Sequence, residues 1–306
     1  MKIGLWITGR FGRGVTFERQ FANMLDQVRL ARDGGFHLLS GGQHFLGPRL
    51  QTFPLLARLA AETGEMEIAT SVVLLPLLNP VQLAEDAATL NAMTGGRFIL
   101  GVGLGHQADE REAFGIEPGE VSSRFDEAMT VMDLVWSGRG ESYRGRFYSL
   151  PALDRSWPIP YPRPRLWIGG SSDRALARAR AYGLPWFPSE VTLDGLVERY
   201  ATGSPVPSAP GAPRPDLPVG VWCHVAETDG AAIEEATRLG QVDPARPDWP
   251  VKVMGSPETV VEQIREWEQR LQPTHLLLRP EVPGMDQGAA MRRIELLAER
   301  VIPALG

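Results

Sequence analysis

The amino-acid sequence predicts a (β/α)₈ barrel (TIM barrel) with insertions, formed by a single domain over residues 1–306. Eight short apolar segments of strand length recur along the chain, and amphipathic helical segments separate most of them. The strand segments are apolar along nearly their whole length, which is typical of a parallel sheet covered by helices. A chain of 306 residues with 43% hydrophobic content is long enough for one such barrel.

Turn-forming residues bound the strand segments, and an amphipathic repeat marks the helices. Three helices are expected in the second half of the chain, over residues 192–200, 230–239 and 257–271. Short segments such as GPRL and GIEPGE are interpreted as connections rather than domain linkers. The eight predicted strands are residues 3–7, 36–39, 66–75, 98–104, 165–168, 184–187, 219–226 and 274–278.

Two further segments interrupt the strand–helix alternation. Residues 143–150, YRGRFYSL, have the aromatic and turn pattern of a small hairpin, which we expect to cover the entrance to a binding site. Residues 203–218 are rich in proline and form a long connection. Together with the loop after His44, these segments are expected to determine substrate selectivity.

The composition excludes several classes of function. A formal charge of −6 argues against a nucleic-acid-binding surface, so the expected partner is a small organic molecule. The N-terminal MKIGLWITGR does not have the pattern of a signal peptide, and no apolar run approaches the roughly 20 residues of a membrane span. These features predict a cytoplasmic protein that does not act on membranes.

The cysteine and histidine content gives no metal site. Cys223 is the only cysteine, which excludes an internal disulfide, a thiolate zinc cluster and a cysteine-ligated iron–sulfur centre. The five histidines form no H-x-H or HExxH pattern. No metal ligand is therefore predicted.

Residues 165–180, RLWIGGSSDRALARAR, carry the most informative local pattern, because an apolar strand runs through a Gly-Gly-Ser-Ser turn into a helix. Gly169 and Gly170 allow the backbone to approach a ligand closely. Ser171 and Ser172 supply hydroxyl and N–H groups at the helix N-terminus, where the helix dipole favours an anion. The pattern predicts a phosphate site; the alternative is an ordinary strand-to-helix turn with an N-cap.

The positions of the histidines along the strands separate chemical from structural candidates. Side chains that follow the carboxyl ends of barrel strands form the active face. His44 and His106 follow the second and fourth predicted strands. His37 and His275 lie near the starts of strands and are expected to be structural, and His224 lies within a strand, where a hydrogen-bonded core histidine is expected.

Three segments support a family resemblance when they are taken together. They are GGQHF, TSVVLLPLLNPVQLAEDAATLNAMTGGRFILGVGLG and RLWIGGSSDRALARARAYG. In combination they resemble the bacterial luciferase-like monooxygenase superfamily over nearly the whole chain. The resemblance implies a reduced flavin or deazaflavin at the carboxyl ends of the strands, with its phosphate at Gly169–Ser172. It also implies a cis peptide bond between Ser71 and Val72, behind the flavin ring.

Further residues are expected to line the cofactor. Gly103 and Gly105, in LGVGLGH, would let a planar ring pass close to the backbone, whereas the absence of G-x-G-x-x-G argues against a dinucleotide fold. Trp6 is expected to pack around the ring or the substrate, although barrel aromatics more often supply buried apolar area. Arg174 is expected to approach the phosphate, the alternative being a solvent-facing charge.

The candidate catalytic residues are His44, His106 and Gln43. His44 matches a histidine found after the second strand in many members of the family, and the resemblance implies that it orients substrate or transfers a proton near pH 7. Gln43 departs from the carboxylate or histidine that often precedes that histidine in relatives. His106 is interpreted as a second polar catalytic group or as a residue that lines the substrate site.

Three functions are compatible with these residues. The first is a monooxygenase that uses reduced FMN and O₂ on a small organic substrate, with a separate flavin reductase as partner because no nicotinamide site is evident. The second is an F420-dependent oxidoreductase in which His44 assists hydride transfer, and the arginine-dominated basic composition is compatible with this cofactor. The third is a non-catalytic flavin-binding protein.

Self-association is also expected, because relatives often form dimers through barrel helices. Apolar residues on two predicted helices would supply the interface, unless they cover the sheet instead. These residues are Leu55, Leu56, Leu59, Val81, Leu83 and Leu90.

Overall fold

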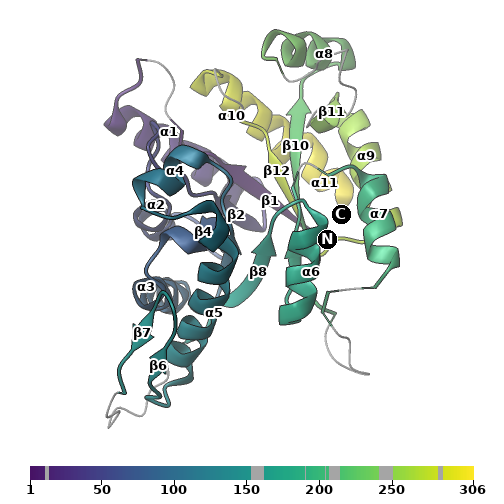
Figure 1. The fold of residues 1–306 in the computed structure, drawn as a ribbon. Coiled ribbons are helices and arrows are strands. Elements are labelled where there is room, and N and C mark those ends of the chain that lie inside the picture. The colour runs from purple at the N-terminus through teal and green to yellow at the C-terminus, as the bar shows by residue number, and fades with distance from the viewer. Residues whose placement is uncertain are drawn as a thin grey trace.

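A computed structural model describes residues 1–10, 14–152, 162–189, 191–203, 205–206, 214–240, 251–281 and 285–306. Within these residues the strands form a curled, parallel barrel, and helices surround it (Figure 1). A parallel bridge between Ser189 and Gly220 connects β9 to β10 and closes the barrel. The strands around the barrel, in order, are β1 (Lys2–Ile7), β2 (Leu38–Gly41), β3 (Glu67–Thr70), β5 (Phe98–Gly103), β8 (Arg165–Gly169), β9 (Trp186–Phe187), β10 (Pro218–Val225) and β12 (His275–Arg279). The predicted fold class is confirmed.

Several of the helices that cover the barrel begin at residues whose side chains accept a hydrogen bond from a first-turn N–H group. Ser172, Thr228 and Ser256 do this for α6, α8 and α9. The helices are α1 (Phe17–Asp33), α2 (Thr52–Leu59), α3 (Pro80–Met93), α4 (Ala108–Ala113), α5 (Val121–Ser137), α6 (Asp173–Tyr182), α7 (Leu193–Ala201), α8 (Asp229–Arg238), α9 (Pro257–Leu271), α10 (Gln287–Leu296) and α11 (Ile302–Leu305), with 3₁₀ turns at Leu75–Leu77 and Pro118–Glu120 and a π-helical turn at Leu297–Val301.

Two strand predictions need correction. The segment predicted as one strand over residues 66–75 is divided into β3, a cis Ser71–Val72 peptide bond and the short β4 (Val73–Leu74). The cis bond itself was predicted and is confirmed. A strand that was not predicted, β11 (Val251–Gly255), pairs with β10 beside the barrel. Its sequence, VKVMG, is short and contains a lysine, so its apolar pattern was too weak to detect.

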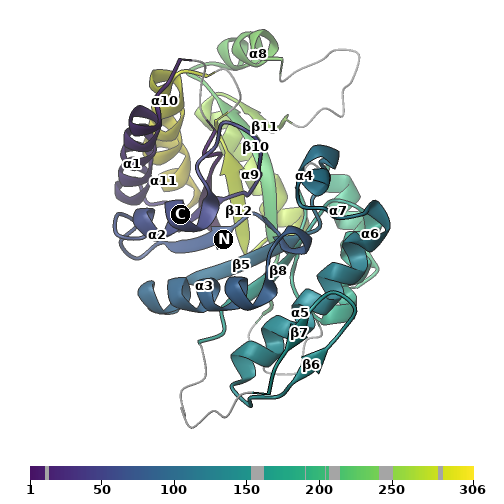
Figure 2. The ribbon, with the colours of Figure 1, turned by 60° about the vertical axis from the view of Figure 1, so that its left-hand side comes forward.

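The predicted hairpin is present, but it does not cover the strand ends. The strands β6 (Tyr143–Arg144) and β7 (Ser149–Leu150) are antiparallel. The Glu127 carboxylate on α5 accepts hydrogen bonds from the backbone N–H groups of Arg146 and Phe147, at 2.8 and 2.9 Å. These bonds hold the hairpin alongside α5, as both views show, so the expectation that it covers a binding site is wrong (Figures 1 and 2).

The apolar residues expected at a dimer interface mostly cover the sheet. Five of them are buried in the core of the single chain: Leu55, Leu56, Leu59, Leu83 and Leu90. Self-association therefore stays a prediction, and these five side chains are unavailable to support it. Half of the proline-rich segment assigned to selectivity, residues 204 and 207–213, lies outside the described residues.

The inside of the barrel is filled by layers of side chains. Near the amino ends of the strands, Glu67 accepts hydrogen bonds from Lys2 and Arg165, both at 2.6 Å, and lies 2.9 Å from His275 Nε2. His275 is thus structural, as predicted, and His37 Nδ1 likewise accepts from the Ile3 N–H. Above this ionic layer is an apolar plug, made by Leu38, Ala69, Ile99, Trp167, Phe187 and Leu277. The plug makes this a filled barrel rather than a pore.

Candidate active site

The layer above the plug differs sharply between its two sides. Because side chains alternate along a strand, the residues two positions after the plug residues also face inward, as do those two positions after Gly4 and Gly220, which pair with Leu277 of the plug from β1 and β10. On β2, β3, β5, β8 and β9 these residues are small, whereas on β10, β12 and β1 they are large. The small side consists of Ser40, Ser71, Gly101, Gly169 and Ser189, and the large side consists of Trp222, Arg279 and Trp6. We call the eight residues the upper layer.

The side chain of Val72, just after the cis bond, extends over the small side of the upper layer. A Cβ atom built on Gly169 would lie 2.5 Å from Val72 Cγ1, and one on Gly103 would lie 2.7 Å from Val72 Cγ2. Gly101 also has no room for a side chain. Its Cβ would lie 2.1 Å from the Thr70 carbonyl oxygen and 3.3 Å from Val72 Cγ1. These glycines therefore make room for Val72, which remains half-exposed above them.

Gln43 holds the segment that carries Val72. Its Oε1 atom accepts a hydrogen bond from the Leu74 N–H at 3.1 Å, and its own N–H donates to the Val72 carbonyl at 2.9 Å. The side chain is buried. The structure thus places Gln43 in contact with the backbone that directly follows the cis bond, and a chemical role for it stays a prediction.

His44 lies in the loop after β2 and is paired with a buried carboxylate on α4. Its Nδ1 atom lies 3.1 Å from Oε1 and 3.3 Å from Oε2 of Glu110, and Oε1 also accepts a hydrogen bond from the Phe45 N–H at 2.5 Å. The Gln107 amide lies 3.0 Å from the same nitrogen. Because a carboxylate only accepts, we assign the His44 proton to Nδ1, which leaves Nε2 as an acceptor.

The surroundings of His44 favour its neutral form. Burial lowers the pKa of His44, and the charge of Arg49 lowers it further, while Glu110 acts in the opposite direction. His106 is exposed, and its ring lies edge-on to that of His44, with 5.8 Å between the ring centroids. The structure thus brings His44 and His106 together, as predicted, and adds Glu110 as the group that orients His44.

The glycine–serine turn adopts the geometry of a capped helix N-terminus. Ser172 Oγ accepts from the Ala175 N–H at 3.3 Å, and Gly170 has φ of 129°, where a side chain would be strained. Ser171 Oγ hydrogen-bonds the carbonyl of Ser189 and so ties the turn to the end of β9. Arg174 is exposed on the first turn of α6, where the N–H groups have no intrahelical acceptor.

The large side of the upper layer is a stacked group. The Arg279 guanidinium carbon lies 3.9 Å from the ring centroid of Trp222 and 5.3 Å from that of Trp6. Beyond Arg279 the chain reaches Glu281, whose carboxylate accepts from the Thr8 hydroxyl at 3.1 Å. Burial raises the pKa of Glu281, against the opposing effects of Thr8 and Arg279.

Comparison with known proteins identifies the family. A family model described as luciferase-like monooxygenase matches residues 1–251. The chain belongs to the luciferase-like monooxygenase family. An uncharacterised protein from Sinorhizobium fredii, y4vJ, is 25% identical over 92% of this chain and 91% of its own length.

Solved structures with the luciferase-like fold resemble this chain over nearly its whole length. Monooxygenase RslO1 from Streptomyces bottropensis has a TM-score of 0.82 at 24% identity, with complete coverage of both chains. The oxygenating constituent of 3,6-diketocamphane monooxygenase from Pseudomonas putida, in complex with FMN, has 0.78 at 18%, covering 99% and 98%. An F420-dependent secondary alcohol dehydrogenase with an F420–acetone adduct has 0.79 at 19%, covering 100% and 99%. At these identities the likeness establishes the fold.

Several residues that lie near the candidate site were not predicted from the sequence. Glu110 and Gln107 follow His106 in the segment HQADE, whose acids read as an ordinary helix start. Arg279 directly follows the predicted strand 274–278, whereas Trp222 lies inside the predicted strand 219–226, 57 positions earlier in the chain. Only the register of β10 with β12 pairs them directly.

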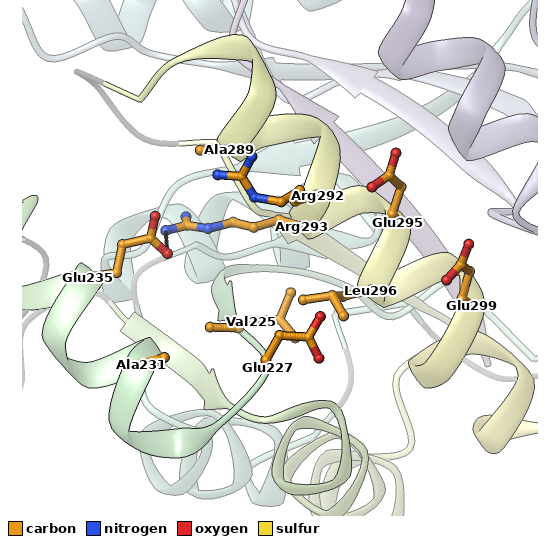
Figure 3. Close-up of a pocket in the computed structure, with 11 residues that line it drawn as sticks. Val225, Glu227, Ala231, Glu235, Ala289, Arg292, Arg293, Glu295, Leu296 and Glu299 are labelled. Atoms are coloured by element: carbon orange, nitrogen blue, oxygen red, sulfur yellow. Dashed lines mark ion pairs between the residues drawn. The ribbon is translucent and has the colours of Figure 1, made fainter.

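A second site lies between α8 and α10 of this luciferase-like chain, where a pocket of about 330 Å³ opens beside the end of β10 (Figure 3). Arg293 is buried there and reaches from α10 to Glu235 on α8 at 3.2 Å. Its other amino group donates to the Pro280 carbonyl at 2.7 Å. His224 Nε2 lies 2.5 Å from Arg293, so the predicted core histidine is confirmed. The cluster ties two helices to the barrel.

In the part of the chain that the structure describes, no group of three or more His, Cys, Asp or Glu residues is arranged to hold a metal ion. None of the helices among the described residues is long and apolar enough to cross a membrane.

Proposed function

We propose that this protein is a monooxygenase that uses reduced FMN and O₂ to oxygenate a small organic substrate. The observation that carries the proposal is His44, held by the buried Glu110 carboxylate beside the small side of the upper layer. Membership in the luciferase-like family and the fold shared with an FMN-bound monooxygenase support it. Reduced FMN would supply two electrons, O₂ one oxygen atom to the substrate, and the second oxygen would leave as water.

The residues present fit such a cofactor. The small side of the upper layer, with Val72 above its glycines, offers an apolar surface without large side chains beneath a planar ring. The hydroxyl of Ser71 is buried and has no hydrogen-bond partner among the described residues. The turn Gly169–Ser172 would hold the phosphate with N–H groups at the start of α6, where the helix dipole favours an anion. Arg174, exposed on that turn, adds a positive charge.

His44 would handle the proton of the reaction. With Nδ1 donating to Glu110, its Nε2 atom accepts a proton from the substrate side and returns it later in turnover. Glu110 is a positioning residue, because it contacts His44 and the Phe45 N–H. Its carboxylate stabilises the imidazolium that forms when Nε2 takes the proton, as a buried acid does in other His–carboxylate pairs.

The second candidate is an F420-dependent oxidoreductase, which the same His44–Glu110 pair favours. Reduction of a carbonyl by hydride transfer needs one proton at the oxygen, and His44 would supply it from Nε2 in its protonated form. A solved neighbour uses F420 with a secondary alcohol, and a curated relative that is 29% identical over 46% of this chain and 38% of its own length is a phthiodiolone/phenolphthiodiolone dimycocerosates ketoreductase from Mycobacterium. In this reaction O₂ is not consumed.

Anaerobic titration of the purified protein with reduced FMN and with reduced F420 separates the two candidates. The proposal expects tighter binding of reduced FMN, followed by substrate-dependent O₂ consumption that His44→Ala lowers at least tenfold. Tighter F420 binding with hydride transfer and no O₂ consumption would move the assignment to the second candidate. Binding without turnover on either route, unchanged in His44→Ala, would leave a flavin-binding protein.

The phosphate site is tested by Ser172→Asp, because Asp still caps α6 but places a negative charge beside the phosphate. The expected result is at least a tenfold loss of FMN affinity with no loss for riboflavin, which lacks the phosphate. Thr228→Asp at the start of α8 is the matched control, since it makes the same change at another N-cap. Equal losses for FMN and riboflavin, or none, would contradict a phosphate at this turn.

A further inference from the structure

The large side of the upper layer takes part neither in the proposed proton transfer at His44 nor in the proposed phosphate binding. Trp222, Arg279 and Trp6 belong to β10, β12 and β1, which are neighbours in the barrel and lie across from the glycine–serine turn after β8. The three side chains are half-exposed, so they are accessible from the carboxyl ends of the strands. A substrate lying on the cofactor would meet this side of the layer.

The stacking fixes the direction in which Arg279 can act. Trp222 lies against the guanidinium at 3.9 Å and Trp6 at 5.3 Å, measured from the guanidinium carbon to each ring centroid. A planar guanidinium stacked on aromatic faces keeps its N–H donors in its own plane, where they match the two oxygens of a carboxylate. Lysine would provide charge without this fork.

The position of Trp6 is itself fixed by the backbone beneath it. A Cβ atom on Gly220 would lie 2.7 Å from the Trp6 ring and 3.0 Å from that of Phe187. The indole is therefore in close contact with the backbone of β10, and its ring centroid lies 5.8 Å from that of Phe187. Arg279 and its aromatic partners form one rigid assembly on top of the plug.

The carboxyl group of Glu281, two residues after Arg279, interacts electrostatically with the guanidinium. Burial raises the pKa of Glu281, so this carboxyl keeps its proton to a higher pH than an exposed one. Its oxygen is also occupied by the Thr8 hydroxyl. In the loop after His44, the Phe45 ring lies tilted against that of Phe114 with 4.6 Å between centroids, and Leu46 is exposed; we call these three apolar side chains the apolar rim.

We propose that Arg279, stacked on Trp222 and Trp6, binds a carboxylate of the organic substrate and so selects planar, apolar carboxylic acids. The inference rests on the proposed function, whose substrate class it names. Arg279 holds the acid group while the flat apolar part of the molecule lies between the indoles and the apolar rim. The substrate is thereby oriented with its reacting part toward His44.

The test uses benzoate and 2-naphthoate, each paired with its neutral amide, at constant ionic strength. Binding to the FMN-loaded protein is followed by tryptophan fluorescence, because Trp222 and Trp6 lie at the site. The expected result is at least tenfold tighter binding of each acid than of its amide, which is the range for a hydrogen-bonded charge pair. Arg279→Gln is expected to reduce this preference to about twofold or less, and Arg279→Lys to leave an intermediate preference.

Arg292→Gln is the matched control, since it removes an exposed arginine on α10 and is expected to retain the full preference. Thermal unfolding establishes that each variant is folded. The proposal is overturned if no acid binds the wild type more tightly than its amide, or if Arg279→Gln keeps the preference. Titration with FMN in the same samples tests the proposed function separately from carboxylate binding. Normal FMN binding without tighter binding of the acids than of their amides therefore refutes this inference alone. Absent FMN binding refutes the proposed function, and the acid preference is then measured without FMN.

Discussion

Gly169 is the position at which a single methyl group should disturb the candidate cofactor surface. In Gly169→Ala the new Cβ would lie 2.5 Å from Val72 Cγ1, 3.3 Å from Val72 Cγ2 and 3.4 Å from the Val102 carbonyl oxygen. Carbon atoms essentially never approach this closely, so Val72 or the backbone must move. Val72 is β-branched and has few rotamers, so the displacement will push its side chain toward the space assigned to the cofactor.

The size of the effect follows from the cost of overpacking a well-filled site, which is about 1–3 kcal/mol. For a chain of this size that corresponds to a fall in melting temperature of roughly 2–6 °C. If half of the cost falls on the cofactor-bound state, the Kd for FMN rises by a factor of roughly 2 to 13. Thermal unfolding and FMN titration measure the two effects separately.

A double mutant identifies the contact that causes the effect. Val72→Ala removes both γ-methyl groups, so Gly169→Ala should be nearly neutral in that background, with a coupling of about 0.5–3 kcal/mol. Gly230→Ala, in the first turn of α8, is the control, because nothing lies within 4 Å of its Cβ. An unchanged melting temperature and FMN affinity in Gly169→Ala, or the same loss with and without Val72→Ala, would refute the reasoning.

Three further predictions concern titrating groups. Glu110→Gln removes the charge that raises the pKa of His44, so the His44-dependent limb of the pH–rate profile should move to lower pH. The value of kcat should also fall tenfold or more. An unmoved limb would argue against the His44–Glu110 pair. Burial, and then the charge of Arg293, lowers the pKa of His224 from 6.5 to about 4. Between these two pH values the unfolded chain binds more protons than the folded chain. The free energy of unfolding should therefore decrease by about 3 kcal/mol as the pH falls through this range. Denaturation at pH 7 and pH 4 measures this, and His224→Gln should flatten the difference. Burial raises the pKa of the Cys223 thiol to about 12, so iodoacetamide should label it only after unfolding, and rapid labelling of the native protein would contradict its burial.

The candidate site depends on contacts between segments far apart in the chain. His44 and Glu110 are 66 residues apart and meet because β2 and β5 lie on either side of β3, so the loops that follow them share one edge of the barrel. The resemblance to relatives pointed to His44 but not to its partner. The sequence of a short helix does not show that its carboxylate is buried, because the burial depends on the loop against which the helix packs.

The sequence by itself determined the barrel, because apolar strand segments and amphipathic helices repeat with periods set by backbone geometry. It also determined the turn at Gly169–Ser172 and, through the family resemblance, the cis bond at Ser71–Val72, since these are local patterns. Only the tertiary structure decided that the glycines at 101, 103 and 169 accommodate Val72, and that the hairpin lies against α5. It alone paired Arg279 with Trp222. The physical reason is that closure and strand register, which depend on the packing of the whole chain, determine which side chains meet.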